Sequence, residues 1–422
     1  MMLRISLFWS ILISCFVAWS QTAVISIESD STVRIQTNTG LYHLSAYGEN
    51  AIEVNYYPNR ASRYLESFAL VAAIGEFDKV EEDNQKLLLQ NGALRCVIQK
   101  SPFSIKFKNP DEQLFTQRPF GLPQSDSVKI ALNIASEDIL YGGGARTIGM
   151  NRRGHRLELY NKAHYGYEEH SDWMNYTLPL VFSSKRYFVH FDNPTKGILD
   201  LDHSKDDTVR FESESGAYRY QVAYAENWDD LLQDFTLLFG RQPLPPIWAL
   251  GNFSSRFGYR SADEVKKVVQ LYEEMSIPLD ALILDLYWFG KTIQGTMGNL
   301  RFDQDSFPNP TDFLSELKAK EIQPILITEP FILSTSDRWE EALTADVLAK
   351  DATGQPYLFD FYFGNTGLID IFSPKAKAWF WDIYKELRKM GAIGVWGDLG
   401  EPEVHPSEIM HHGGRTANEL HN

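Results

Sequence analysis

The chain has 422 residues, of which 44% are hydrophobic and 23% are charged, and its formal net charge is −16. A chain of this length usually divides into more than one domain, and the composition is that of a folded globular protein rather than a disordered one. The negative charge excludes nucleic acid as a favoured partner, because it would repel a phosphate backbone.

Residues 1–20 have the pattern of a secretory signal peptide. Arg4 supplies a positive charge, an apolar run follows over residues 5–17, and small residues precede Gln21. The apolar run is too short to span a bilayer, so we expect a secreted or periplasmic protein without a membrane span. An alternative interpretation is a lipoprotein signal with Cys15 acylated, although the strongly apolar residues after that cysteine argue against it.

The chain contains only two cysteines, and one of them lies in this leader. Cys96 would then be alone in the mature chain, without a partner for an internal disulfide, and its apolar neighbours predict a buried thiol. The histidines His405, His411 and His412 are close in sequence but match no zinc-ligand spacing. We therefore expect no metal and no other cofactor.

The pattern of residues 21–242 is typical of an antiparallel β-sandwich domain. Short segments that alternate polar and apolar residues, such as 104–107 and 218–222, recur between clusters of Gly, Asn, Asp and Pro. The best helical period in this region covers residues 228–239. Many short strands separated by turn residues predict two packed sheets.

The pattern changes at the proline-rich segment 243–246, and residues 243–422 alternate apolar runs with helical periods. Strands are predicted at 247–251, 279–286, 322–328 and 393–396, and helices are predicted to begin near Ser261, Pro310, Ser336 and Pro374. Four such units in succession imply a parallel sheet with right-handed crossovers. No glycine-rich phosphate loop follows the first strand, which argues against a nucleotide-binding fold.

Acidic and aromatic residues follow the predicted strands at the ends where a (β/α)8 TIM barrel carries its active site. Asp285 ends the second strand, Glu329 the third and Asp398 the fourth. We therefore expect the first half of a TIM barrel after the β-sandwich. Since an eight-unit barrel needs four more units beyond residue 422, we also expect the chain to be a fragment of a longer protein.

Glycoside cleavage uses a carboxylate nucleophile and a second carboxyl group as the acid. Asp398 follows a buried apolar strand beside Trp396 and is the candidate nucleophile, with Glu401 as a supporting carboxylate. Asp285 and Glu329 are candidate ligands of sugar hydroxyls. Asp398 and Asp285 also have an alternative interpretation, in which each carboxylate binds only the amides of its own loop.

Aromatic and basic residues complete the candidate substrate site. Tyr287 and Trp288 directly follow the second strand, where their rings would cover the faces of a sugar, and Trp396 stands beside the candidate nucleophile. Arg256 follows the first predicted strand and is a further candidate substrate ligand.

Segment 396–402, Trp-Gly-Asp-Leu-Gly-Glu-Pro, resembles the nucleophile signature of glycoside hydrolase family 31, which comprises retaining α-glucosidases, α-xylosidases and α-transglucosylases. Segments 246–251 with 256–259 resemble the family's first barrel strand, and 277–285 resembles its second-strand motif. Segments 141–144 and 153–154 are similar to the loop-bearing β-sandwich that reaches over the family's active site. The resemblance implies that Asp398 is the nucleophile and that Asp285 holds the glycone sugar.

Four positions depart from the family pattern. Ala163 stands where many members carry an aspartate, and Glu329 where many have aspartate. The sequence Asp-Leu-Tyr-Trp from Asp285 is more similar to the α-xylosidase and transglucosylase branch, and Gly400 replaces the usual asparagine. The family's acid/base is an aspartate on a later barrel strand, beyond residue 422, so the resemblance assigns no acid/base residue in this chain.

The predicted function is that of a retaining enzyme that hydrolyses or transfers α-linked glucosyl residues through a covalent bond to Asp398. α-1,4-linked gluco-oligosaccharides are the favoured partners, and the sequence does not separate hydrolysis from transfer. An α-xylosidase is the runner-up. A non-catalytic carbohydrate-binding protein is the alternative from another class, and the oligomeric state is left unassigned.

Overall fold

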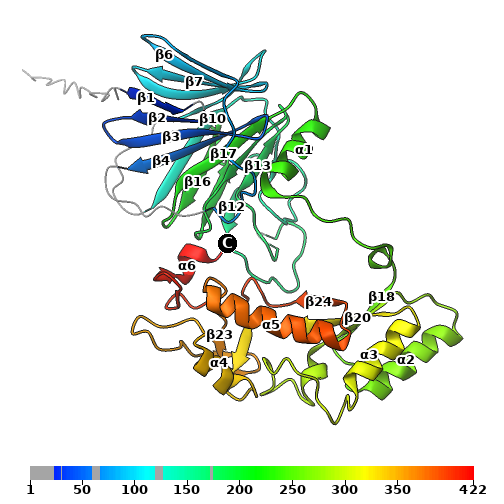
Figure 1. The fold of residues 1–422 in the computed structure, drawn as a ribbon. Helices are drawn as coiled ribbons and strands as arrows, with labels where there is room; N and C mark the ends of the chain where they lie inside the picture. The colour runs from blue at the N-terminus through cyan, green and yellow to red at the C-terminus, as the bar shows by residue number, and fades with distance from the viewer. Residues whose placement is uncertain (1–22, 30, 59–66, 119–126, 172–173) are drawn as a thin grey trace, which may run out of the picture.

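The computed structural model describes residues 23–29, 31–58, 67–118, 127–171 and 174–422. Within these ranges a β-sandwich is followed by a smaller α/β part, which lies below the sandwich in Figure 1. The predicted signal peptide and Cys15 lie outside the described residues. Cys96 is fully buried in the sandwich, as its apolar neighbours predicted, and burial raises the pKa of its thiol.

The sandwich consists of two large antiparallel sheets. The first, in spatial order, contains β1 (Val24–Ser29), β2 (Thr32–Gln36), β3 (Gly40–Tyr47), β4 (Ala51–Pro58), β17 (Tyr218–Tyr224), β14 (Tyr187–Phe191), β13 (Leu180–Ser183) and β11 (Leu140–Gly142). The second contains β12 (Arg156–Leu159), β15 (Gly197–Leu201), β16 (Thr208–Ser213), β10 (Val128–Ile134), β9 (Gln113–Gln117), β8 (Phe103–Lys108), β7 (Leu94–Lys100), β6 (Lys86–Asn91) and β5 (Lys79–Glu82).

Alternation of side chains explains how the two sheets pack. Along β10, Val128, Ile130 and Leu132 are buried while Lys129 points to solvent, which is the pattern of a strand with one face on the core. The inward faces of both sheets form one hydrophobic core that contains many aromatic rings. The predicted antiparallel sandwich is therefore confirmed.

Helix α1 (Trp228–Phe239) has the bounds that its periodicity predicted. Asn227 caps it, because the side chain of this residue accepts a hydrogen bond of 2.9 Å from the backbone N–H of Asp230. The helix packs against the first sheet through a cluster that includes Leu231, Leu238 and Phe188.

The α/β part is built on a parallel sheet in the order β18-β19-β20-β24. Its strands are β18 (Phe253–Ser255), β19 (Ala281–Leu284), β20 (Gln323–Thr328) and β24 (Gly394–Gly397), and its connecting helices are α2 (Ala262–Glu274), α3 (Pro310–Ala319), α4 (Trp339–Ala345) and α5 (Pro374–Met390). The predicted four-unit half-barrel is confirmed. Ser261 caps α2, accepting from the N–H of Glu264 at 3.2 Å.

The strand predicted at 247–251 is wrong. Residues Ile247–Leu250 form a 3-10 helix, η1, in which the N–H of Ala249 donates to the carbonyl of Pro246 at 2.9 Å. Ile247 and Leu250 are largely exposed, so this apolar run is not buried as a core strand. Its backbone groups are satisfied within the turn after the prolines, and the first barrel strand, β18, begins only at Phe253.

Smaller elements complete the structure. They are η2 (Leu286–Phe289), the antiparallel sheet β21-β23-β22 (Phe331–Leu333, Gly364–Leu368 and Phe359–Phe361), the hairpin of β25 (Met410–His411) and β26 (Arg415–Thr416), and the short helix α6 (Ala417–Leu420). The helix predicted near Ser336 begins at Trp339. No helix among the described residues is long and apolar enough to cross a membrane.

A chain of buried histidines joins the two parts at the C-terminal end of the sequence. His411 donates from Nδ1 to Asp370 at 2.9 Å and contacts His405 at 2.8 Å, and His405 contacts His421 at 2.9 Å. His421 donates to the carbonyl of Asn161 in the sandwich. Asn422 adds bonds to the same region, and Figure 1 shows the C-terminus beside β12.

Burial lowers the pKa of His405 to about 3 and the pKa of His421 to about 4, with the neighbouring rings adding to the effect on His405. In the folded protein His405 and His421 therefore stay unprotonated at pH values below about 6.5, at which the same histidines in the unfolded chain bind a proton. We expect the contribution of these two histidines to the free energy of unfolding to be complete above pH about 6.5 and to be lost as the pH falls toward 4.

Thermal unfolding followed between pH 7.5 and 4.5 measures this dependence. His405→Gln should reduce the decline in the free energy of unfolding over this pH range by about 3 kcal/mol, the contribution of the one histidine that it removes. His170→Gln is the matched control, because His170 is exposed. A decline of equal slope in the unmodified protein and in His405→Gln would contradict the assignment.

Candidate active site

Three carboxylates follow neighbouring strands of the parallel sheet. Asp285 follows β19, Glu329 follows β20 and Asp398 follows β24. Thr328 pairs with Gly397 in the β20–β24 ladder, so Glu329 and Asp398 stand next to each other one residue further on. The N–H of Asp398 donates to the carbonyl of Thr328 at 2.8 Å, which holds Asp398 at the strand end. Neighbouring strands lie about 4.8 Å apart, so the three side chains are gathered at one edge of the sheet.

The carboxylates influence one another electrostatically. Burial raises the pKa of Asp398, and a hydrogen bond from the N–H of Leu399 opposes that effect. Burial also raises the pKa of Asp285, as does the nearby charge of Asp398, although the N–H of Leu286 donates to Asp285 at 2.7 Å. Like charges in a partly desolvated site disfavour full ionisation, so the protonation states of these groups are linked.

Glu329 is the most deeply buried of the three. Its side chain is 1% exposed, and neither carboxyl oxygen has a hydrogen-bond partner among the described residues. Burial raises its pKa well above the usual value, and the charges of Asp398 and Asp285 raise it further. The protonated form of Glu329 is therefore favoured beside an ionised Asp398.

Glu401 lies on the loop that follows Asp398 and is half-buried. Burial raises its pKa, and the nearby charges of Glu403 and Asp398 contribute in the same direction. Glu401 is thus within electrostatic reach of Asp398, and its supporting role stays a prediction.

The structure separates the aromatic candidates. Trp396 is 43% exposed on β24, beside Asp398. Tyr287 is mostly buried and packs edge-on against Phe257 at 5.7 Å between ring centroids. Trp288 is fully buried, and its indole N–H donates to the carbonyl of Ile327 at 3.0 Å. A ring without exposed surface has no face for a sugar, so Trp288 is a core residue here and the sugar contact predicted for it is not available.

Arg256 directly follows β18, at the same edge of the sheet as Asp285. Its guanidinium forms an ion pair with Glu264 in the first turn of α2 and lies 4.9 Å from the ring of Tyr259. Its side chain is half-exposed and is engaged by its own neighbourhood. The structure therefore gives Arg256 a local partner in Glu264, and its substrate contact stays a prediction.

Three residues near Asp398 were not predicted from the sequence. Glu403 lies five residues after Asp398, Tyr165 comes from a loop of the sandwich, and Tyr362 lies in the turn between β22 and β23. The charges of Glu403 and Asp398 both contribute to raising the pKa of Tyr165, after burial, so the sandwich loop reaches this edge of the sheet. The only sequence feature that could have pointed to one of these residues is the position of Glu403 directly after the Glu401–Pro402 pair.

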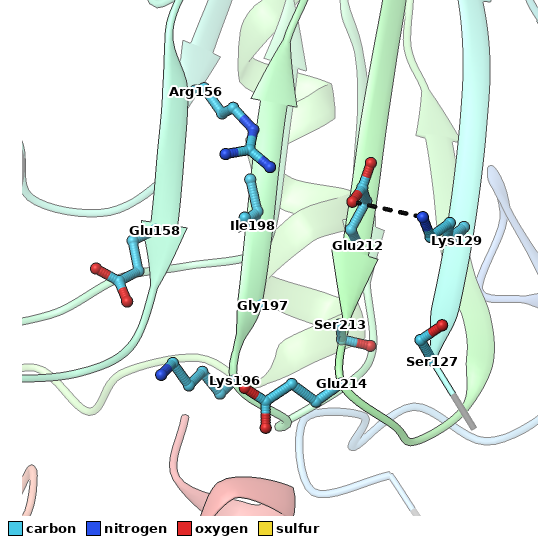
Figure 2. A pocket seen from close by; sticks show the side chains of 10 residues that line it. All are labelled: Ser127, Lys129, Arg156, Glu158, Lys196, Gly197, Ile198, Glu212, Ser213 and Glu214. Carbon is cyan, nitrogen blue, oxygen red and sulfur yellow. Dashed lines mark ion pairs between the residues drawn. The ribbon is translucent and has the colours of Figure 1, made fainter. Parts of the chain in front are cut away.

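A separate pocket of about 600 Å³ lies on the solvent face of the second sandwich sheet, shown in Figure 2. Its charged lining residues are Lys129, Arg156, Lys196, Glu158, Glu212 and Glu214. Lys129 and Glu212 form an ion pair of 4.0 Å across it. No aromatic ring lines this pocket, so it lacks the stacking surface that the strand-end site carries, and it contains none of the predicted site residues.

No group of three or more His, Cys, Asp or Glu side chains within the described ranges is arranged to hold a metal ion. The buried chain of His405, His411 and His421 is consistent with that finding, because these rings bind one another, Asp370 and a backbone carbonyl.

Two family models match the chain in succession. The glycosyl hydrolase 31 N-terminal galactose mutarotase-like domain matches residues 23–200, and the glycosyl hydrolases family 31 TIM-barrel domain matches residues 242–422. Both belong to one family and together cover most of the chain.

Curated relatives are consistent with this assignment. The chain is 26% identical over 404 residues to "Alpha-glucosidase 2" of Bacillus thermoamyloliquefaciens, a match that covers 91% of this chain and 51% of that protein. It is 25% identical over 357 residues to "Alpha-xylosidase XylQ" of Lactiplantibacillus pentosus, covering 81% and 45%. The chain thus spans about half the length of these relatives.

Solved structures share the fold. A GH31 dextranase of Flavobacterium johnsoniae complexed with glucose superimposes with a TM-score of 0.84 at 22% identity, over 95% of this chain and 50% of that one. A GH31 α-xylosidase from a soil metagenome gives a TM-score of 0.81 at 18% identity, over 94% and 60%. With both domains matched in order and the strand-end carboxylates in place, the chain belongs to glycoside hydrolase family 31.

Proposed function

We propose that the protein is a retaining glycosidase or glycosyltransferase that acts on α-linked glucosyl residues through a covalent bond to Asp398. One observation carries the proposal: Asp398 stands at the end of β24, next to Glu329 in strand register and within electrostatic reach of Asp285. A carboxylate held at the carboxyl end of a barrel strand is placed to attack a bound sugar.

The reaction would proceed in two displacements. A carboxylate oxygen of Asp398 bonds to the anomeric carbon as the bond to the leaving-group oxygen breaks, and that oxygen takes a proton from a general acid. Water or the hydroxyl of an acceptor sugar then attacks the same carbon and releases Asp398. Asp285 would accept hydrogen bonds from glycone hydroxyls, and we assign the general acid to none of the described residues.

Two further features of the protein belong to the proposal. The pattern of residues 1–20 supports export from the cytoplasm. Relatives named α-glucosidase and α-xylosidase both match the chain, which supports an α-linked substrate and keeps α-xylosides as the second candidate.

Replacing the nucleophile tests the central assignment. In the full-length enzyme, Asp398→Ala should lower turnover of an aryl α-glucoside by about 10³-fold or more, because no covalent intermediate can form. A mechanism-based fluoroglycoside should attach to Asp398 alone, as measured by peptide mass spectrometry. Retention of more than about a tenth of the original rate by a folded Asp398→Ala protein would refute the nucleophile role.

Product analysis separates transfer from hydrolysis. With maltotriose as the donor we expect oligosaccharides longer than the substrate to accumulate beside glucose and maltose, because an acceptor hydroxyl competes with water for the intermediate. Chromatography of a time course measures the ratio, and glucose and maltose alone would exclude transfer. A parallel assay with an aryl α-xyloside decides the runner-up: faster turnover than with the α-glucoside would make the protein an α-xylosidase.

Ionisation at the site should also be visible in stability. The folded pKa of Glu329 is raised well above 4.5. Its contribution to the free energy of unfolding is therefore complete below pH about 4.5 and is lost as the pH rises toward and through the folded pKa. The uncharged Glu329→Gln carries no such dependence.

We therefore expect Glu329→Gln to gain stability relative to the unmodified protein as the pH rises from 4.5 to 8. Denaturant titrations at several pH values measure that difference, with exposed Glu408→Gln as the matched control. Parallel stability curves for Glu329→Gln and the unmodified protein would show that Glu329 is not the buried, proton-binding member of the group.

A further inference from the structure

The histidine chain that joins the two parts of the molecule also crosses the loop that carries Asp398. This nucleophile loop, residues 398–409, begins at the end of β24 and contains His405. Nδ1 of His405 lies 2.9 Å from Nδ1 of His421, and its Nε2 lies 2.8 Å from Nε2 of His411. The two hydrogen bonds of this one ring therefore tie the nucleophile loop to the β25–β26 hairpin and to the residue that follows α6.

The number of protons in the chain follows from its four hydrogen bonds. The carbonyl of Asn161 only accepts, so Nε2 of His421 carries a proton and, in the neutral ring, its Nδ1 is an acceptor. His405 must then donate from Nδ1, and its Nε2 accepts from Nε2 of His411. A neutral His411 would be left with a bare Nδ1 that faces the carboxylate of Asp370 at 2.9 Å, which is a repulsive pair of acceptors. Four hydrogen bonds need four protons, and three neutral rings supply three.

The fourth proton belongs to the Asp370 end of the chain. Burial lowers the pKa of His405 to about 3 and the pKa of His421 to about 4, so neither ring holds an added proton near neutral pH. Two backbone amides, including that of His412 at 2.8 Å, already donate to the carboxylate of Asp370. Amide donors favour an ionised carboxylate, which places the fourth proton on Nδ1 of His411.

A pocket brings this end of the chain to solvent. Asp370 and His411 line a pocket of about 370 Å³, although no side chain of the histidine chain is more than 8% exposed. At the sandwich end, the ring of Tyr160 stacks on His421 at 3.6 Å between centroids. The titratable and charged groups around the chain are Tyr160 and Lys196 at the sandwich end, and Asp346, Lys350, Asp351 and His412 around the pocket.

We propose that the histidine chain holds one proton more than three neutral imidazoles, and that this proton couples the position of the nucleophile loop to pH. Loss of the proton leaves Nδ1 of His411 facing Asp370 without a donor. A further proton on His405 places two N–H groups against each other. Either change breaks a bond of the chain and frees the nucleophile loop from the sandwich. The proton count is independent of the proposed function, whereas the effect on catalysis rests on it.

The proton count predicts how stability depends on pH. Above pH about 6.5 a histidine in the unfolded chain is mostly neutral, so the folded protein binds about one proton more than the unfolded chain does. The free energy of unfolding therefore falls as the pH rises above neutral. This dependence is opposite in sign to the one expected in acid, where the unfolded chain binds the additional protons at His405 and His421.

Nitrogen NMR of the full-length protein with isotope-labelled histidine measures the proton count directly. At pH 7 we expect protons on both ring nitrogens of His411, on Nδ1 alone of His405 and on Nε2 alone of His421. Replacing each histidine by glutamine in turn assigns the signals. A neutral His411, or the opposite tautomer at His405 or His421, would overturn the proposal.

Asp370→Asn supplies the fourth donor without a titratable proton, because its amide can donate to a neutral His411 and accept from the N–H of His412. Denaturant titrations between pH 7 and 8.5 should show a slope of stability against pH that is smaller by about one proton than in the unmodified protein. Asp346→Asn is the matched control: Asp346 lines the same pocket, and its left-handed backbone suits asparagine. Equal slopes for Asp370→Asn and the unmodified protein would show that the chain holds no added proton.

Kinetics with an aryl α-glucoside test the coupling to the nucleophile loop. A glutamine keeps one donor and one acceptor, so His405→Gln should leave kcat within about 2-fold of the unmodified enzyme. His405→Phe should lower kcat about 10-fold and change KM less than about 2-fold. An unchanged kcat in His405→Phe would overturn the coupling.

Two further outcomes keep the proposals separate. If His405→Phe fails to fold, Asp370→Asn decides the coupling, because its kcat should decline less between pH 7 and 8.5 than that of the unmodified enzyme, and an equal decline overturns it. If the unmodified enzyme does not cleave the glucoside, the proposed function fails, and the NMR and denaturant results still decide the proton count.

Discussion

The parallel ladder between β20 and β24 is the constraint on which the site depends. Thr328 and Gly397 are paired, and the carbonyl of Thr328 accepts the N–H of Asp398. A parallel ladder places equivalent strand ends at one edge of the sheet, so side chains separated by about 70 residues in the sequence become neighbours. Without that register, Glu329 and Asp398 would not lie together.

Crowding of these carboxyl groups gives them different chemical properties. Glu329 has almost no exposed surface and favours its protonated form, whereas Asp398 is half-buried and receives a backbone hydrogen bond that partly offsets desolvation. Two similar side chains on adjacent strands thus differ because one is enclosed and the other is reached by solvent and an amide. That difference suits one group to hydrogen bonding and the other to nucleophilic attack.

The sandwich contributes to the same edge through its loops. Asn161 receives a hydrogen bond from His421 and closes a loop that carries Tyr165 toward Glu403. The histidine chain from Asp370 to His421 therefore has a positioning consequence beyond joining two domains. Burial lowers the pKa values of His405 and His421, so the junction depends on these two rings staying uncharged.

The sequence alone predicted the sandwich, the half-barrel and the gathering of Asp285, Glu329 and Asp398 at one edge of a sheet. These follow from local pattern: strand alternation, helix periods with caps such as Ser261, and carboxylates directly after apolar strands. It failed at residues 247–251, where an apolar run looks the same whether it is buried or forms an exposed turn after prolines.

Only the tertiary structure decided which side chains are exposed at the strand-end edge and which are buried in the core. Tyr287 and Trp288 come shortly after Asp285, yet both rings are buried, and Trp288 has no exposed surface. Glu403 and Tyr165 are brought to the same region from different domains, and no local pattern carries that information. Burial and the long-range contacts that set it depend on how distant segments pack, so they lie outside what periodicity and motif spacing determine.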